Sequence, residues 1–233
     1  MNDCVSVCMA VKNGSRFIRQ QIGSILPQLS DGDELIVSDD HSDDDTLSLI
    51  QSYGDPRIKV VTNSSAGLVS NFQNALSKSC CEHIFLADQD DIWHLQKIHI
   101  MKRHLKTHDL VICDCQVVNE NLEPIHESFF ELNKSKSGIL RNLIKNSYMG
   151  CCMAFNHNVL EMALPFPAGI PMHDLWIGLQ AEKHFNVKFI HDKLVTHRRH
   201  RLNASSTSSI SNFNLQQKLT GRLALIKNLI YAN

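Results

Sequence analysis

Short apolar runs alternate with amphipathic segments along the first half of the chain. Apolar runs predict four strands, at Val5 to Val11, Leu35 to Val37, Ile58 to Thr62 and Ile84 to Ala87, the last of them buried. Apolar residues at helical spacing predict helices between them, at Arg16 to Leu26, about Asp44 to Tyr53, and Leu68 to Ser77. This alternation predicts an α/β fold with a mostly parallel, doubly wound sheet.

The second half is less regular. A helix is expected from about Leu95 to His108 and a strand from Leu110 to Cys115, followed by a polar stretch over 119–147. After an apolar segment and a Pro-rich loop, a helix is expected to begin at His173 and run to about His184. Two short strands should follow, at Val187 to Ile190 and Leu194 to His197.

The C-terminal residues form a Ser-rich stretch and then an amphipathic pattern. From Phe213 to Ala232, apolar residues recur at helical spacing with Lys218, Arg222 and Lys227 between them. Such a helix either packs on its own domain or contacts a membrane surface or a partner through residues 213–232.

Composition narrows the classes of partner. Hydrophobic residues make up 43% and charged residues 20% of 233 residues, as in an ordinary globular core, and the net charge is −1. Without a basic excess, no nucleic-acid partner is expected. No apolar run reaches membrane-spanning length, and the N-terminus is typical of a first strand rather than a signal peptide. The eight Cys lack zinc-site spacing, so reduced cytosolic thiols are expected.

Polar clusters follow three of the predicted strands. Lys12-Asn13-Gly14 comes after the first strand, Asp39-Asp40 after the second, and Asp88, Asp90 and Asp91 after the fourth. Because ligands of such sheets bind at the carboxyl ends of the strands, the clusters predict one site. Carboxylates gathered there favour a divalent cation, Mn²⁺ or Mg²⁺, which often carries a diphosphate. An acidic turn that caps the next helix is the alternative.

The ordered motifs carry a family resemblance. VSVCMAVKNGSRFIRQQIGSIL, IVSDDHSDDDT, NFQNAL and FLADQDDIW together resemble family 2 inverting glycosyltransferases of the GT-A fold. The DQDDIW form is similar to bacterial rhamnosyltransferases and other O-antigen or polysaccharide glycosyltransferases. The resemblance implies a GT-A domain over 1–205, with a nucleotide-sugar half (1–110) and an acceptor half (111–205). Residues 206–233 would be a Ser-rich hinge and a terminal helix.

The resemblance also implies the nucleotide and metal residues. The base and ribose pocket would be formed by Ala10, Val11, Asn13, Asp39 and Asp40, with Asp88 also near the nucleotide. This chain has Val11-Lys12-Asn13 where the family often has Thr-Tyr-Asn, which removes a stacking surface. The metal ligands would be Asp88, Asp90 and His200, the last in a segment that resembles Arg-x-His-x-x-Asn. A basic strand end is the alternative for His200.

The general base implied by the resemblance is Asp174, with His173 where the family often has Glu. An N-cap is the alternative role of Asp174. His173 would bind the acceptor or tune Asp174, and the donor sugar or the acceptor would also meet Asp91, Gly150, Cys151 and Trp176. Core packing is the alternative for Trp176.

The implied activity is transfer of a sugar to a hydroxyl of a growing bacterial surface glycan, with a metal ion assisting. The donor would be dTDP-rhamnose, or UDP-glucose or UDP-galactose, and the acceptor a lipid-linked glycan. The protein would be cytoplasmic, near the inner membrane. A sugar-1-phosphate nucleotidyltransferase is one alternative, although it would need a basic Gly-rich loop after the first strand. A catalytically inactive carbohydrate-binding or scaffold protein is the other.

Overall fold

The computed structural model describes residues 3–200, 203 and 215–231. One sheet of nine strands runs through these residues in the order β3-β2-β1-β4-β8-β6-β9-β5, with β7 paired to β6. The strands are β1 (Val5–Val11), β2 (Glu34–Asp39), β3 (Ile58–Thr62), β4 (His83–Asp88), β5 (Ile92–Trp93), β6 (Leu110–Asn119), β7 (Pro124–His126), β8 (Met153–Asn156) and β9 (Val187–Arg199).

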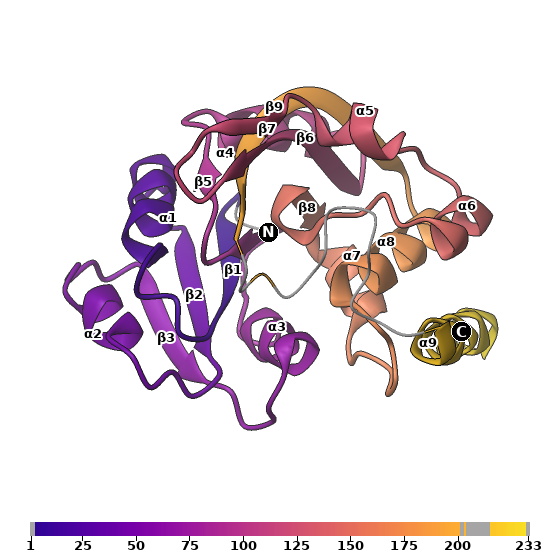
Figure 1. Cartoon of the computed structure of the whole chain (residues 1–233), viewed down its shortest axis with the longest axis horizontal. Helices are drawn as coiled ribbons and strands as arrows, with labels where there is room; N and C mark the ends of the chain where they lie inside the picture. Colours follow the sequence, from indigo (N-terminus) through magenta and orange to yellow (C-terminus); the bar gives the residue numbers. More distant parts are fainter. Residues whose placement is uncertain (1–2, 201–202, 204–214, 232–233) are drawn as a thin grey trace.

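The first half has the predicted α/β arrangement. Strands β1 to β4 are parallel, and every residue of β1 is buried between β2 and β4. The helices of this half are α1 (Ile18–Ile25), α2 (Thr46–Gln51) and α3 (Leu68–Leu76). Figure 1 shows α1 and α2 on one face of the strands and α3 on the other, so this half is doubly wound.

The second half makes the sheet mixed. Strand β8 is antiparallel to both β4 and β6, β5 is antiparallel to β9, and β6 is parallel to β9. The two late strands expected from the sequence are one strand, β9, whose pairing with β6 shifts register next to Asp114. The remaining helices are α4 (Lys97–Leu105), α5 (Phe129–Asn133), α6 (Ile139–Ile144), α7 (His157–Ala163), α8 (His173–His184) and α9 (Leu215–Tyr231), with 3₁₀ turns η1 (Leu26–Gln28) and η2 (Gly150–Cys152).

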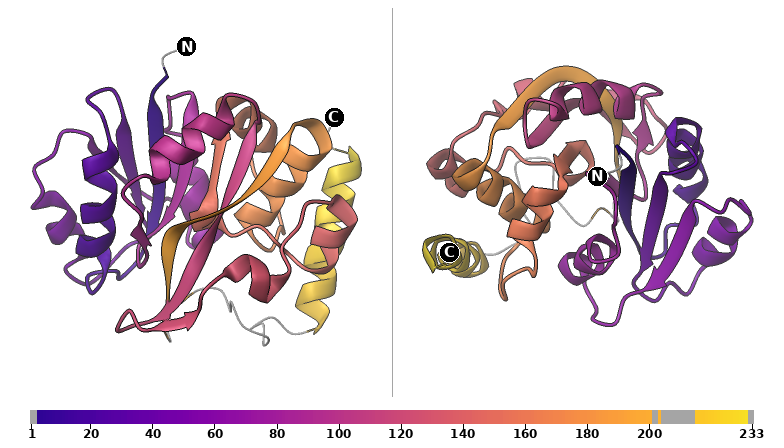
Figure 2. Two further views of the ribbon diagram at one scale, coloured as in Figure 1. Left: turned by 90° about the horizontal axis from the view of Figure 1, so that it is seen from above. Right: turned by 180° about the vertical axis from the view of Figure 1, so that it is seen from behind.

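The terminal helix α9 packs beside α8 through one face. Leu225 and Leu229 are buried, and the Lys183 ammonium donates a hydrogen bond to the Leu229 carbonyl over 2.7 Å. Figure 2 shows α9 along the edge of the second half. Among the described residues, no helix combines the length and the apolar character that crossing a bilayer requires. The expected Ser-rich hinge lies outside the described residues.

The expectation of reduced thiols is wrong for one pair of cysteines. Cys4 and Cys81 are joined by a disulfide, with their Cα atoms 5.1 Å apart. They meet because Cys4 directly precedes β1 and Cys81 lies just before β4, and these strands pair in parallel with Val5 opposite His83. The other six cysteines are free.

Candidate active site

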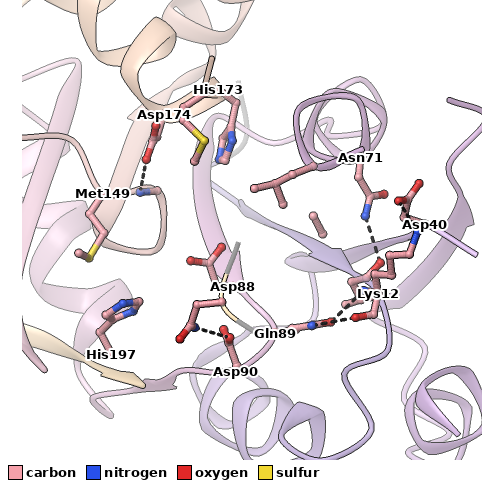
Figure 3. Close-up of a pocket in the computed structure, with 16 residues that line it drawn as sticks. Lys12, Asp40, Asn71, Asp88, Gln89, Asp90, Met149, His173, Asp174 and His197 are labelled. Carbon is pink, nitrogen blue, oxygen red and sulfur yellow. Dashed lines mark hydrogen bonds and ion pairs between the residues drawn. The ribbon is translucent and has the colours of Figure 1, made fainter. Parts of the chain in front are cut away.

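A cavity of about 270 Å³ opens at the carboxyl ends of β1 and β4. One wall comes from the ends of these strands, and the facing wall comes from η2 and the start of α8 (Figure 3). The predicted site residues that line it are Ala10, Val11, Asp40, Asp88, Asp90, Gly150, His173 and Asp174. Lys12 of the predicted Lys12-Asn13-Gly14 cluster also lines it, and the lining residues outside the prediction are Leu68, Asn71, Gln89, Met149, Met172, His197 and Asn203.

Asp40 and Lys12 form the polar end of the cavity. The Asp40 carboxylate accepts hydrogen bonds from the Lys12 ammonium (3.1 Å), the Asn63 amide (2.8 Å) and the Gly67 N–H (3.2 Å). Burial raises the pKa of Asp40, but these hydrogen bonds outweigh that effect and hold the pKa below its usual value. Asp40 is therefore an ionised, fixed acceptor at this end of the cavity.

Gln89 and Asn71 hold the backbone at the polar end of the cavity through hydrogen bonds. Gln89 exchanges two hydrogen bonds with the backbone of Lys12, at 2.9 and 3.0 Å. Asn71 donates to the Val11 carbonyl over 3.1 Å, and its own side-chain oxygen has no hydrogen-bond partner among the described residues. A buried acceptor without a partner is costly, so this oxygen is suited to an N–H or O–H group of a ligand.

Asp39 and Asn13 do not line the cavity. The Asp39 carboxylate accepts hydrogen bonds from the backbone and side chain of Ser42, and Asn13 accepts one from the Asp43 N–H over 2.9 Å. Both residues therefore hold the loop after β2 in shape, and the structure places Asp40, not Asp39, against the cavity.

The acidic cluster at the end of β4 fits a divalent cation. The Asp88 side chain lies in the cavity beside Asp90 (Figure 3). Its burial, together with the charges of Asp91 and Asp90, raises the pKa of Asp88 well above the usual value. The Asp90 carboxylate is 2.7 Å from His200 Nε2 and accepts from the Asn203 amide over 3.0 Å. Carboxylates crowded in this way favour a bound cation, and oxygen ligands suit Mg²⁺ or Mn²⁺.

Asp91 lies behind the cavity wall. It is fully buried, and one carboxylate oxygen accepts from the Arg198 N–H (2.9 Å) and lies 3.0 Å from His197 Nδ1. Burial opposes ionisation of both groups, but their attraction lowers the pKa of Asp91 and raises that of His197. Cys151 is buried in the same cluster, 3.9 Å from His197 Nδ1. Neither Asp91 nor Cys151 lines the cavity, whereas their neighbour His197 does.

Asp174 stands in the first turn of α8 and faces the acidic cluster across the cavity. It is 6% exposed; one carboxylate oxygen accepts from the Gly150 N–H (3.2 Å) and the other from the Leu175 N–H (2.6 Å). Burial raises its pKa to about 6, although the backbone hydrogen bonds act in the opposite direction. A carboxylate with a pKa near neutrality is suited to proton transfer.

His173 is a buried imidazole with no hydrogen-bond partner among the described residues. Its ring stacks on Phe72 with centroids 3.8 Å apart, and burial lowers its pKa to about 3. Residue 150 must be small here, because a Cβ at Gly150 would lie 3.1 Å from His173 Nε2. His173 is therefore neutral at ordinary pH, with hydrogen-bonding capacity left for a ligand.

Trp176 does not shape the cavity. It is 2% exposed, and its indole N–H donates to the Ala163 carbonyl over 2.9 Å. The structure thus favours core packing, the alternative raised by the sequence, over an acceptor contact.

Several lining residues escaped prediction although they stand inside the recognised motifs. Gln89 lies within DQDD, Asn71 within NFQNAL, and His197 and Asn203 within HRRHRLN. Their positions within these motifs were the only signal for them, because single Asn, Gln or His residues occur throughout the chain without a site.

Comparison with known proteins identifies the family of the chain. The model of the family described as "Glycosyl transferase family 2" matches residues 6–162. The chain is 28% identical over 208 residues to the Escherichia coli UDP-Glc:alpha-D-GlcNAc-diphosphoundecaprenol beta-1,3-glucosyltransferase WfgD. The matched region covers 88% of this chain and 79% of WfgD. It is 31% identical over 98 residues to the dTDP-rhamnosyl transferase RfbG of Shigella flexneri, over 39% of this chain and 34% of that protein.

Two solved structures have the same fold. S. aureus TarS in complex with UDP-GlcNAc superposes with a TM-score of 0.71 at 16% identity, over 97% of this chain and 73% of that one. The mannosyltransferase PcManGT of Pyrobaculum calidifontis, in complex with GDP-Man and Mn²⁺, superposes with a TM-score of 0.62 at 19% identity, over 83% of this chain and 56% of that one. The family match covers well over half of the chain, and on this ground the chain belongs to glycosyl transferase family 2, with the GT-A fold.

Proposed function

We propose that the protein transfers a sugar from a pyrimidine nucleoside diphosphate sugar to an acceptor hydroxyl, with inversion at the anomeric carbon. The observation that carries the proposal is the placement of a candidate cation site and a candidate general base on facing walls of one cavity. The acidic cluster of Asp88 and Asp90 forms one wall, and a buried carboxylate with a raised pKa, Asp174, forms the other.

The nucleotide would lie at the end of the cavity that holds Asp40 and Asn71. A uracil or thymine base presents one ring N–H, which matches the ionised Asp40 carboxylate, and carbonyl groups, which match the Lys12 ammonium. The Asn71 oxygen would accept from a hydroxyl of the ribose. The ribose would contact the backbone at Ala10 and Val11, where β1 ends.

Asp88 and Asp90 would hold Mn²⁺ or Mg²⁺, with His200 beside Asp90. When bound, the ion neutralises the charge that develops on the leaving diphosphate. His200 and Asn203 fix the Asp90 carboxylate, and Asp91 fixes His197 on the adjoining wall. These contacts hold the acidic wall in place before the donor arrives, which lowers the cost of reorganisation during the reaction.

Asp174 would remove the proton of the acceptor hydroxyl as that oxygen attacks the anomeric carbon from the face opposite the diphosphate. Its two backbone hydrogen bonds fix the carboxylate. Proton removal by a positioned base contributes roughly 10²–10⁴-fold to rate. His173, beside it, would exchange hydrogen bonds with hydroxyls of the donor sugar or the acceptor.

The relatives suggest the finer specificity. The E. coli relative is named for UDP-Glc and a diphosphoundecaprenol-linked acceptor and matches most of this chain, whereas the S. flexneri relative is named for dTDP-rhamnosyl transfer and matches less of it. We favour a UDP-hexose donor, then dTDP-rhamnose, and a lipid-linked glycan acceptor at a membrane surface. A nucleotidyltransferase is disfavoured, because the single lysine after β1 pairs with Asp40.

Calorimetric titration with UDP and with dTDP, with and without Mn²⁺, tests the proposal. We expect Mn²⁺-dependent binding of one nucleotide. The Asp90→Asn variant should lose the Mn²⁺-dependent part, and the exposed Asp192→Asn variant should bind as the parent does. If nucleotide affinity is the same with and without Mn²⁺, and the same in the parent and the Asp90→Asn variant, the assignment of the metal site is refuted.

A further inference from the structure

Two helices expose large apolar side chains on the side of the molecule where the chain ends. Exposed apolar residues are common, but here they are both numerous and highly exposed. The residues concerned, called here the α6–α9 face, are Leu140 (79% exposed), Ile144 (73%), Leu223 (65%), Ile226 (40%) and Ile230 (64%). The helices adjoin, because the Arg222 guanidinium donates a hydrogen bond to the Ile144 carbonyl over 2.7 Å. The five side chains therefore belong to one surface.

One face of helix α9 is buried against the protein, and another carries exposed apolar side chains. Gly221, Leu225 and Leu229 are buried and lie on one side at four-residue spacing. At 100° per residue, the three exposed apolar residues of α9 fall within an arc of about 60° on the other side. Arg222 and Lys227 border this arc, one on each edge. An apolar stripe with basic borders on the face turned away from the protein is typical of helices that lie in a membrane interface.

The charge on the two helices and on the residues that flank α6 is positive, and Glu182, which accepts a hydrogen bond from the Gly138 N–H at the start of α6, is an acidic neighbour. Residues 134–147 and 215–231 contain seven Lys or Arg and no Asp or Glu, although the whole chain has 24 acidic and 23 basic residues. A second copy of the chain would bring the same positive charge against this face, and like charges repel. A surface with anionic headgroups attracts the basic residues and accepts the apolar ones. Charge therefore favours an anionic bilayer over self-association.

The face adjoins the catalytic wall. A Cβ at Gly221 would lie 3.2 Å from the Pro171 side chain, so α9 rests on the loop that leads to His173 and Asp174. An uncharged groove runs along this loop, past Phe166, Pro167 and Ile170, and shares Leu68 and Met172 with the cavity. A path thus leads from the neighbourhood of the α6–α9 face to the general base.

We propose that the α6–α9 face binds the surface of an anionic lipid bilayer, with its five apolar side chains in the headgroup region. The protein then lies with the loop before Asp174 next to the lipid, where an acceptor carried on a lipid can enter the cavity. The entry of a lipid-carried acceptor rests on the proposed function, whereas binding of the α6–α9 face to the bilayer does not.

Flotation of the whole chain with vesicles, without donor or acceptor, tests the proposal. We expect binding to vesicles with about 30% phosphatidylglycerol in phosphatidylcholine, weak binding to pure phosphatidylcholine, and loss of binding at high salt. The double variants Leu140→Ser/Ile144→Ser and Ile226→Ser/Ile230→Ser should each lower the partition coefficient about ten-fold or more, because each removes two large apolar groups from the bilayer. Circular dichroism shows whether these variants fold.

Leu95→Ser is the matched control. Leu95 is 71% exposed, as the face residues are, but it lies between β5 and α4, far from α6 and α9 in Figure 1. This variant should bind vesicles as the parent does. Equal binding by all variants, or no binding to anionic vesicles, would overturn the proposal. So would a dimer in light scattering that the serine variants dissociate, since a second copy would then cover the face. A parent that binds vesicles but transfers no sugar would instead count against the proposed function alone.

Discussion

Replacing Asp174 by Asn should slow sugar transfer about 10²–10⁴-fold and, at neutral pH, make the protein more stable. The carboxylate is buried at the start of α8, and burial raises its pKa to about 6 from an ordinary value of 3.8. A raised pKa means that the folded state binds this proton more tightly than the unfolded state does. The favourable contribution is present in full below the ordinary value of 3.8 and is lost as the pH rises from there to about 6.

The size of the effect follows from the two pKa values. A difference of about two pKa units corresponds to about 3 kcal/mol, which the ionised carboxylate costs the fold at pH 7. Asn removes this cost, but its NH₂ group must face either the Gly150 or the Leu175 N–H, at a cost of about 1 kcal/mol. The net gain of about 2 kcal/mol should raise Tm by about 4–8 °C in a chain of this size.

Thermal unfolding of both proteins, without nucleotide, at several pH values measures this gain. The stability advantage of the variant should be largest above pH 7. It should shrink as the pH falls from about 6 and be gone near the ordinary pKa of 3.8, where the carboxyl is protonated in the unfolded chain as well. Sugar transfer by the parent should rise with pH through about 6, and the variant should be about 10²–10⁴-fold slower. Asp192→Asn, at an exposed position, controls for the loss of one negative charge. A variant less stable than the parent at pH 7, or a stability difference unaffected by pH, would refute the electrostatic reasoning; transfer at the parental rate would remove Asp174 as the base.

Three further changes test other parts of the site. Removal of divalent ions with EDTA should abolish transfer, and added Mn²⁺ should restore it in an activity assay, because the acidic wall needs a cation. His173→Phe keeps the stacking on Phe72 and removes two nitrogens without partners, so stability in thermal unfolding should be equal or higher by about 1 kcal/mol, while kcat/KM falls about ten-fold. Trp176→Phe removes the hydrogen bond to the Ala163 carbonyl and should lower the free energy of unfolding by about 1–3 kcal/mol in urea titration, with an unchanged donor KM.

Periodicity predicted the elements that carry a pattern of apolar residues in their own sequence. Strand β1, strand β3 and helix α8 begin and end where the pattern of apolar residues places them. Strand β5 has only two residues and exists because it pairs with Thr196 and Val195 of β9, about a hundred residues later. Such a pairing leaves no local pattern. The polar middle hid α5 and α6 for a different reason: they are short, and α6 turns apolar residues outward.

The site was predictable by type of residue but not by orientation. Asp90 and Asp91 are neighbours in sequence, yet Asp90 lines the cavity and Asp91 points into the core, where His197 and Arg198 surround it. Those partners come from the last strand of the sheet, so no rule about the DQDD motif alone separates the two carboxylates. The disulfide of Cys4 and Cys81 depends in the same way on the pairing of β1 with β4.

The continuity of the sheet limits how the enzyme can move during turnover. The two halves are joined strand to strand, since Phe85 of β4 pairs with Ala154 of β8, and β8 pairs in turn with β6. A hinge between the halves would break this ladder, so we expect no rotation of one half against the other. Motion is left to connections at the rim of the cavity, such as the 164–172 loop, where Gly169 has a φ of +81°. We therefore expect substrate entry and product release to depend on a few torsion angles in this short connection, so that turnover can be altered there without disturbing the groups that carry out the chemistry.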